Sequence, residues 1–380
     1  MDLSRSNAGG HTSPYGPLGF ADPILLVTSL ALTAFGIFAV YVAGSDDGET
    51  YALNQILGFF VGLAGAVPLA LFDYRRLRQY LPLIYGIAIV MLLAVDIIGI
   101  SAKGAQRWID IGPVQVQPSE FAKFLMVVVL AGYFAEHRLS DNETFLKAVG
   151  IIALPALLVF AQPDLGTTLV FGALFFTMAF IGGARLYQLG LLVASGVVVF
   201  ALALKLNIIE EYQIQRLTSF INPAAAEVTD EGYQVFQSKV AIGSGGITGK
   251  GLDAVTLAKL GFLPEDHTDI IFSNLAERIG FVGAILLLGL FFVLVWRMLH
   301  VATVSRDRFG VLIAVGIATI FLFHVFVNVG MAMGIMPVTG IPLPFISYGR
   351  SNLVVSVISL GLLQSIAIRS KSEGLKGADP

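Results

Sequence analysis

The chain has no cysteine and few charged residues. The absence of cysteine excludes structural disulfides, thiol catalysis and thiolate metal sites, and it indicates no particular compartment. Charged residues make up only 13% of the 380, whereas 56% are hydrophobic and the mean hydropathy is +0.82. Soluble globular domains do not have this balance. We therefore expect a membrane protein, and we expect no nucleic-acid partner.

A signal peptide is also lacking. Residues 1–20 are polar and rich in Gly, Ser and Pro, without a basic n-region, an apolar h-region or a cleavage site. We interpret them as a disordered tail or a remnant of cloning. The rest of the chain is expected to form a single transmembrane domain over 21–370, followed by a cytoplasmic tail over 371–380.

Apolar runs of about 17–25 residues, the length needed to cross a bilayer, recur along the whole sequence. They predict an all-α polytopic integral membrane protein with about ten transmembrane helices. A long polar loop, about 207–269, separates spans seven and eight. The predicted spans are 24–43, 55–72, 81–100, 119–135, 146–162, 166–183, 187–206, 270–296, 309–333 and 352–368.

Basic residues collect in the even-numbered connections and after span ten, whereas the first connection, 45–49, is acidic. By the positive-inside rule, both termini face the cytoplasm and the odd-numbered connections face outward. Most of the unusual polar residues then face outward as well. The basic residues that carry this argument are Arg75, Arg76, Arg78, Arg138, Lys147, Arg185, Arg297, Arg306, Arg308, Arg369, Lys371 and Lys376.

The stretch 262–272 closes the long polar loop and brings Glu265, His267 and Asp269 to the start of span eight. Ionisable groups at the edge of a bilayer are costly and often functional. The alternative is a helix cap, because acidic residues stabilise the positive end of a helix. Thr268 or Asp269 could cap the helix that begins near residue 270. This stretch alone leaves capping and chemistry equally open.

Other outward polar residues carry similar pairs of interpretations. Arg107 and Trp108 lie in an alternating stretch expected on the membrane surface, either as an interfacial anchor or as a contact for a lipid headgroup. Glu120 and Lys123 are three apart at the start of span four and share a helix face, which favours an ion pair facing a cavity. Asp164 is either the N-cap of span six or a third carboxylate of the outer face.

The long loop and the end of span nine contribute irregular backbone. In the loop, Arg216, Lys239 and the glycine-rich stretch 243–246 stand out, and the glycines would permit close approach to a ligand. The apolar residues within 235–242 suggest a surface helix or re-entrant piece. Prolines and glycines in 334–350 predict that span nine breaks near the outer surface. Asp96, His324 and Asn328, inside predicted spans, are interpreted as hydrogen-bonding residues between helices.

Taken together, six stretches resemble the SEDS family of cell-wall proteins (shape, elongation, division, sporulation). They occur in family order across the chain, and the stretches at 263–265 and 338–344 resemble the elongation members (RodA-like) more than the division members. The matching stretches are 104–108, 117–123, 162–167, 232–251, 262–280 and 336–348. The chain departs from the family pattern at 252–259, 277–278 and 350–352, which leaves the proposed catalytic carboxylate in place.

The resemblance implies an inverting peptidoglycan glycosyltransferase that polymerises lipid II from an undecaprenyl-pyrophosphate-linked donor. It also implies a class B penicillin-binding protein as the crosslinking partner, in the bacterial inner membrane. The family's catalytic carboxylate corresponds to Asp269. Its other important positions correspond to Arg107, Trp108, Glu120, Lys123 and Asp164.

Our hypothesis makes Asp269 the base that takes the proton of the acceptor hydroxyl. One or more of four cationic residues would contact the departing pyrophosphate. Glu120 and Asp164 would orient one of them, Lys123, or hold a divalent cation such as Mg²⁺ or Mn²⁺. A lipid II flippase and a non-catalytic scaffold for the penicillin-binding protein are the alternatives. The four cationic residues are Arg107, Lys123, Arg216 and Lys239.

Overall fold

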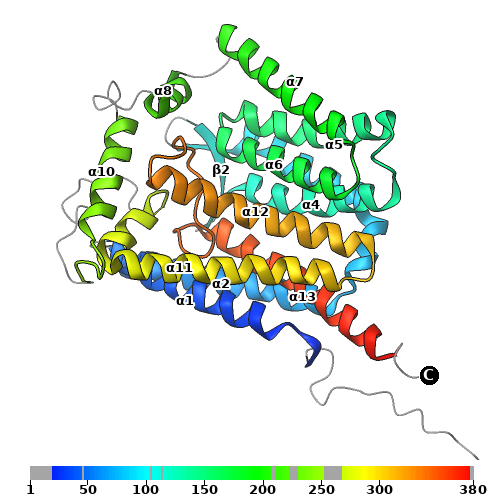
Figure 1. The fold of residues 1–380 in the computed structure, drawn as a ribbon, viewed down its shortest axis with the longest axis horizontal. Coiled ribbons are helices and arrows are strands. Elements are labelled where there is room, and N and C mark those ends of the chain that lie inside the picture. Colours follow the sequence, from blue (N-terminus) through cyan, green and yellow to red (C-terminus); the bar gives the residue numbers. More distant parts are fainter. Residues whose placement is uncertain are drawn as a thin grey trace, which may run out of the picture.

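The computed structural model describes residues 19–44, 47–102, 105–112, 114–206, 211–221, 230–251 and 268–376. Within these ranges, nine helices are long and apolar enough to cross a membrane, and the apolar helix Leu165–Ile181 is slightly shorter. Together they match the ten predicted spans, so the polytopic helical architecture is confirmed. Figure 1 shows them as a bundle whose members run alongside one another. The ten helices are α1 (Pro23–Ala43), α2 (Gly48–Leu71), α3 (Leu81–Ile98), α4 (Pro118–Glu136), α5 (Asn142–Ala161), α6 (Leu165–Ile181), α7 (Leu186–Lys205), α11 (Ile271–Val304), α12 (Arg308–Ala332) and α13 (Arg350–Lys376).

Burial separates a central group of helices from a peripheral one. In α13, 94% of the most apolar stretch of the helix is buried, and the corresponding shares in α4 and α12 are 78% and 61%. In α7 only 11% is buried, as expected for a helix that faces lipid. Close packing in the centre depends on small residues. On α13, for example, a Cβ at Gly361 would collide with the backbone of Ala66 on α2.

Aspartate side chains cap the first turns of four transmembrane helices. Asp22, Asp141, Asp164 and Asp307 occupy the N-cap positions of α1, α5, α6 and α12, and each carboxylate accepts a hydrogen bond from the backbone N–H three residues later. These bonds satisfy donors that would otherwise lack a partner, and the negative charge complements the helix dipole. A short 3-10 helix, η3 (Tyr74–Tyr80), joins α2 to α3.

A small antiparallel sheet adds to the predicted all-α architecture between α3 and α4. It consists of β1 (Ile100–Ala102), β2 (Ala105–Ile111) and β3 (Val114–Val116), in that order. Ile109 opposes Val116 in the register of β2 and β3. The alternating polar and apolar residues, which predicted a segment lying on the surface, have the two-residue period of strands.

The chain between α12 and α13, residues 333–349, is irregular, as the prolines and glycines predicted. We call it the segment after α12, or the irregular segment. Gly334 and Gly340 both have φ 73°, and Phe345 has φ 65°, which is unusual for a residue with a side chain. Phe345 is nevertheless fully buried, and Gly36 on α1 permits this close approach, because a Cβ there would collide with the Phe345 carbonyl. The packing of α1 therefore holds the irregular segment inside the protein.

Two further helices belong to the long loop: α8 (Glu211–Ile221) and α10 (Asp230–Ser244). In Figure 1 they lie at the same end of the bundle as β2, and the C-terminus lies at the other end. The apolar residues predicted to form a surface or re-entrant piece fall in α10. Residues 207–210, 222–229 and 252–267 are outside the described part, so the predictions for Glu265 and His267 are not addressed by the structure.

The glycine-rich stretch packs against α11. Helix α11 is broken at Gly280, where φ is 67° and ψ is −171°. The N–H groups of Phe281 and Val282 donate to the carbonyls of Gly246 and Ile247, at 2.9 and 3.1 Å. On the other side of the break, the N–H groups of residues 250 and 251 donate to the carbonyls of residues 277 and 278. The glycines thus allow the backbone of this stretch to approach the backbone of α11.

Candidate active site

A buried ion pair on α4 forms the centre of the candidate site. Lys123 Nζ lies 2.7 Å from Glu120 Oε1, and the two residues are 3% and 4% exposed. Asn352, in the first turn of α13, donates from Nδ2 to the second carboxylate oxygen of Glu120 at 3.0 Å. Because a buried charge is stable only when it is well paired, these contacts explain how the pair persists inside the bundle. The predicted pair of Glu120 and Lys123 is confirmed.

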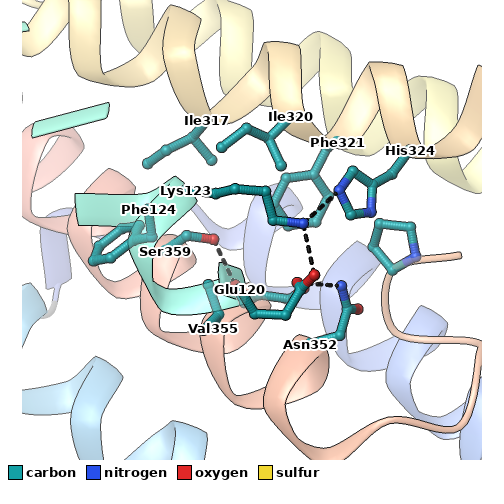
Figure 2. Close-up of a pocket in the computed structure, with 12 residues that line it drawn as sticks. Glu120, Lys123, Phe124, Ile317, Ile320, Phe321, His324, Asn352, Val355 and Ser359 are labelled. Atoms are coloured by element: carbon teal, nitrogen blue, oxygen red, sulfur yellow. Dashed lines mark hydrogen bonds and ion pairs between the residues drawn. The ribbon is translucent and has the colours of Figure 1, made fainter. Parts of the chain in front are cut away.

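Lys123 has a second partner across the bundle. Its ammonium lies 3.0 Å from His324 Nε2, and Figure 2 shows it directed between the His324 ring and the Glu120 carboxylate. His324 Nδ1 lies 3.1 Å from the carbonyl oxygen of Pro342, in the irregular segment after α12. The ring therefore connects α4 to that segment, in keeping with the hydrogen-bonding role predicted for it.

The ion pair lines a small cavity. Apolar side chains of α12, among them Ile317, Ile320 and Phe321, face the pair across this space (Figure 2). The cavity volume is about 20 Å³, which suits a water molecule but not a sugar ring. The predicted cavity-facing position of the pair is confirmed, and binding of a larger substrate against it would require the cavity to widen.

Asp269 lies at the start of α11, beside the same irregular segment. Its side chain is half-buried, and its carbonyl oxygen accepts a hydrogen bond from Asn328 Nδ2 at 3.0 Å. Asn328 Nδ2 also donates to the Ile341 carbonyl at 2.8 Å. Ser347 Oγ donates to the carbonyl of Thr268 at 2.7 Å. Three contacts thus hold residues 268–269 and the segment after α12 together.

The capping interpretation for Thr268 and Asp269 is wrong. The N-cap of α11 is Ile270, whose apolar side chain accepts no hydrogen bond from the helix. The chain at 268–270 forms a turn before the helix begins, so the Asp269 side chain is one residue too early for the cap position.

Arg107 joins the sheet to the link between α5 and α6. Its Nε donates to the Gln162 carbonyl at 3.2 Å, and its guanidinium also contacts the Pro163 carbonyl. These carbonyls follow the last turn of α5, where positive charge is favourable. Trp108, next to it in β2, is half-buried and opposite Ile100. Gln162 in turn donates to Asp96 at 3.1 Å, which confirms a hydrogen-bonding role for Asp96.

Asp164 is the N-cap of α6. One carboxylate oxygen accepts from Thr167 N at 3.0 Å and the other from Thr167 Oγ1 at 2.9 Å. The residue is buried, and a Cβ at Gly166 would approach the Thr339 carbonyl to 2.6 Å. Asp164 therefore begins a helix that packs closely on the segment after α12.

The two basic residues of the long loop differ in exposure. Arg216 on α8 is half-buried, and Lys239 on α10 is exposed. Lys239 Nζ lies 3.3 Å from the position that a Cβ would take at Gly334, so its ammonium is beside the end of α12. Lys239, Asp269 and the first turn of α6, which Asp164 caps, thus lie against different parts of one irregular segment. In the described ranges, no three His, Asp or Glu residues are grouped as metal ligands.

Asn352 is the site residue that sequence reasoning missed. It was noted only within a departure from the family pattern at 350–352, and not as a contact of Glu120. Its place in the first turn after an irregular, proline-rich segment is the signal that could have drawn attention to it, because polar residues there can turn back toward a cavity.

Comparison with known proteins decides the family. The model of the FtsW, RodA and SpoVE cell cycle proteins matches residues 23–372. The chain belongs to this family. It is 38% identical to the peptidoglycan glycosyltransferase MrdB of Escherichia coli K12, over 92% of this chain and 94% of that one. It is 35% identical to stage V sporulation protein E of Bacillus subtilis, over 92% of this chain and 98% of that protein.

Solved structures of the family have the same fold. A chain from a peptidoglycan synthase complex that coordinates polymerisation and crosslinking is 28% identical, with a TM-score of 0.78 over 92% of this chain and 98% of that chain. The rod shape determining protein RodA of Thermus thermophilus is 29% identical, with a TM-score of 0.69 over 91% of this chain and 96% of that chain. The RodA-like resemblance of the sequence is confirmed.

Proposed function

We propose that this chain polymerises lipid II into glycan strands at an outward-facing site, with Asp269 as the catalytic base. The enzyme class follows from the family: the chain is a multi-pass peptidoglycan glycosyltransferase of cell-wall synthesis. The single observation that carries the proposal for the site is the arrangement of one irregular segment. It packs beside Asp269 and, through Pro342, contacts the His324 ring that holds Lys123.

The reaction requires two opposite charges at different places. Asp269 would take the proton from the sugar hydroxyl of one substrate as that oxygen attacks the anomeric carbon of the other. The bond from that carbon to the pyrophosphate breaks at the same time, so the configuration inverts and no covalent enzyme intermediate forms. Lys123 would stabilise the negative charge that develops on the pyrophosphate, and Lys239 and Arg216 would receive the rest of the diphosphate.

The other predicted residues would act around this centre. Glu120 would orient Lys123, as its 2.7 Å contact supports, and Asn352 would hold Glu120. Arg107 and Trp108 would present the sheet to the lipid headgroup, and Asp164 would fix α6 against the irregular segment. In the alternative, the carboxylates of Glu120 and Asp164 would hold a divalent cation.

The site would face outward in the inner membrane, with both termini in the cytoplasm. This orientation rests on the basic residues of the even-numbered connections. A class B penicillin-binding protein would be the crosslinking partner, because the solved relative belongs to a complex that coordinates polymerisation with crosslinking.

The deciding experiment is polymerisation of purified lipid II by the wild type and Asp269→Asn, each with and without the class B partner. We expect glycan polymer on a gel from the wild type and none from Asp269→Asn. The melting temperature of the variant should equal that of the wild type, which shows that it is folded. Asp110→Asn is the matched control, because Asp110 is an exposed aspartate of β2, and it should retain activity. Polymer from Asp269→Asn would remove this residue from the base role. No polymer from any folded protein would favour the flippase or scaffold.

A further inference from the structure

The two contacts of His324 define its chemical form. Nδ1 lies 3.1 Å from the Pro342 carbonyl, which can only accept a hydrogen bond, so Nδ1 must carry a hydrogen. Nε2 lies 3.0 Å from the Lys123 ammonium, which can only donate, so Nε2 must offer its lone pair. A doubly protonated ring would direct a hydrogen at the ammonium and repel it. The geometry therefore fits only the neutral ring with the hydrogen on Nδ1.

The ring stands between two parts of the candidate site. Lys123 and its partner Glu120 belong to α4, whereas Pro342 follows Ile341, whose carbonyl is held by Asn328. Asn328 lies four residues after His324, so both side chains project from neighbouring turns of one face of α12. Through these residues, α12 fixes one short segment against Lys123 on one side and against Asp269 on the other.

A buried lysine needs such a second contact. Its ammonium sits on a flexible four-carbon stem and can rotate about several bonds. The pair with Glu120 alone would fix its distance from one carboxylate oxygen but not its direction. An acceptor on the opposite side fixes the direction as well, and it satisfies a second N–H that would otherwise be buried without a partner.

We propose that His324 is a positioning residue, which in its neutral Nδ1–H form orients the Lys123 ammonium and links it to the segment that borders Asp269. The inference rests on the proposed function for the role of Lys123 toward the leaving pyrophosphate. His324 itself transfers no proton and touches no reacting atom. Its contribution lies in the lone pair that it presents to Lys123.

Three substitutions separate this role from the alternatives. His324→Gln places its side-chain amide near the position of Nε2, where the amide oxygen can accept from Lys123; the amide nitrogen is a donor. His324→Asn is shorter, reaches the position of Nδ1 and keeps only the contact with Pro342. His324→Leu retains an apolar side chain of similar bulk and loses both contacts. We expect kcat for lipid II polymerisation within about threefold of wild type for Gln, and lower by about tenfold to a hundredfold for Asn and Leu.

Each other outcome overturns the proposal. Activity of His324→Leu near that of the wild type would mean that the ring only fills space. Loss of activity in all three variants, with melting temperature and partner binding intact, would mean that an acceptor facing Lys123 is not what the ring contributes to activity. Should the Leu variant fail to fold, the contrast between Gln and Asn gives the same decision, because both are polar and only one reaches Lys123.

A second readout keeps the test independent of the proposed function. Melting temperatures of His324→Leu and His324→Gln are compared in the wild type and in Lys123→Met. If the contact with Lys123 matters, the difference between Leu and Gln should shrink when Lys123 is absent; an unchanged difference would overturn the proposal. Asp269→Asn, assayed in parallel, tests the catalytic base, so failure of that assignment and failure of the His324 inference are distinguishable.

Discussion

Asp307 shows at the scale of a single residue how one carboxylate can hold several elements together. It caps α12 through Gly310 N at 3.0 Å, contacts the Tyr74 hydroxyl, and pairs with Arg75 Nε and a terminal guanidinium nitrogen of Arg78, each at 3.3 Å. Burial raises the pKa of the Asp307 carboxyl, but the bonds from Tyr74, Gly310 and Arg75 outweigh burial and leave that pKa below its usual value. The charged form is therefore the one that the fold stabilises.

A lowered pKa determines the sign of the pH dependence. The stabilisation by Asp307 is fully present above the pKa of the unfolded chain, about 3.9, and is lost as the pH falls through the folded value. We expect Asp307→Asn to lower the melting temperature in detergent by a few degrees at pH 7, and by less at about pH 3, below the pKa of the unfolded chain.

Asp141→Asn is the matched control for this prediction, because Asp141 also caps a helix but is exposed, and no arginine in the described part of the chain pairs with it. Asparagine is itself a good N-cap residue, so this variant should change little at pH 7. An equal loss in both variants would mean that the arginine pairs of Asp307 contribute nothing beyond capping.

The break in α11 is the feature to test at the scale of an element. Gly280 has φ 67°, which residues with a side chain rarely adopt, and a Cβ there would collide with the backbone of Gly249. Gly280→Ala should therefore disrupt the backbone pairing of 246–251 with α11 and loosen α10, which carries Lys239. We expect a lower melting temperature and reduced polymerisation.

Gly289→Ala provides the comparison on the same helix. Gly289 lies in the regular part of α11, and among the described residues no atom outside its own stretch of helix lies within 4 Å of its potential Cβ. Alanine is favoured over glycine there by about 0.5–1 kcal/mol, so this variant should be as stable as the wild type or more so. If Gly280→Ala proved equally well tolerated, the backbone pairing could not be what holds α10 in place.

The sequence predicted well whatever depends on neighbours along the chain. The ten spans follow from apolar runs, and the pair of Glu120 and Lys123 follows from a three-residue spacing on one helix face. Asp164 at the start of α6 fits one of its two predicted roles. In each case, the physical cause lies within one helix or at its end.

The predictions that fell short depend on distant contacts or on local geometry. His324 meets Lys123 from 201 residues away, and Asn352 meets Glu120 from 232 residues away, so no periodicity could indicate either contact. The strands β1–β3 were interpreted only as a surface segment, because alternation also fits a chain lying on the membrane. The cap of α11 was misplaced because a turn at 268–270 delays the helix by one residue.

At the scale of the whole molecule, the elements separate toward two ends of the bundle. In Figure 1, β2, α8 and α10 gather at one end, and the C-terminus lies at the other. The first group belongs to the connections predicted to face outward. The basic residues lie instead in the connections predicted to face the cytoplasm. One orientation in the membrane would therefore place the candidate site outside and the termini inside.

The absence of cysteine makes this orientation directly testable, since any cysteine introduced is the only reactive thiol. Asp110 in β2 and Arg306, between α11 and α12, are both exposed and lie in connections predicted on opposite sides. In spheroplasts, a membrane-impermeant maleimide should label Asp110→Cys at once and Arg306→Cys only after permeabilisation. The cysteine-free parent measures background, and retained polymerisation shows that each variant is folded. Labelling in the reverse order would mean that the Glu120–Lys123 pair and Asp269 lie toward the cytoplasm. The site would then be on the wrong side of the membrane for polymerising a substrate displayed outside.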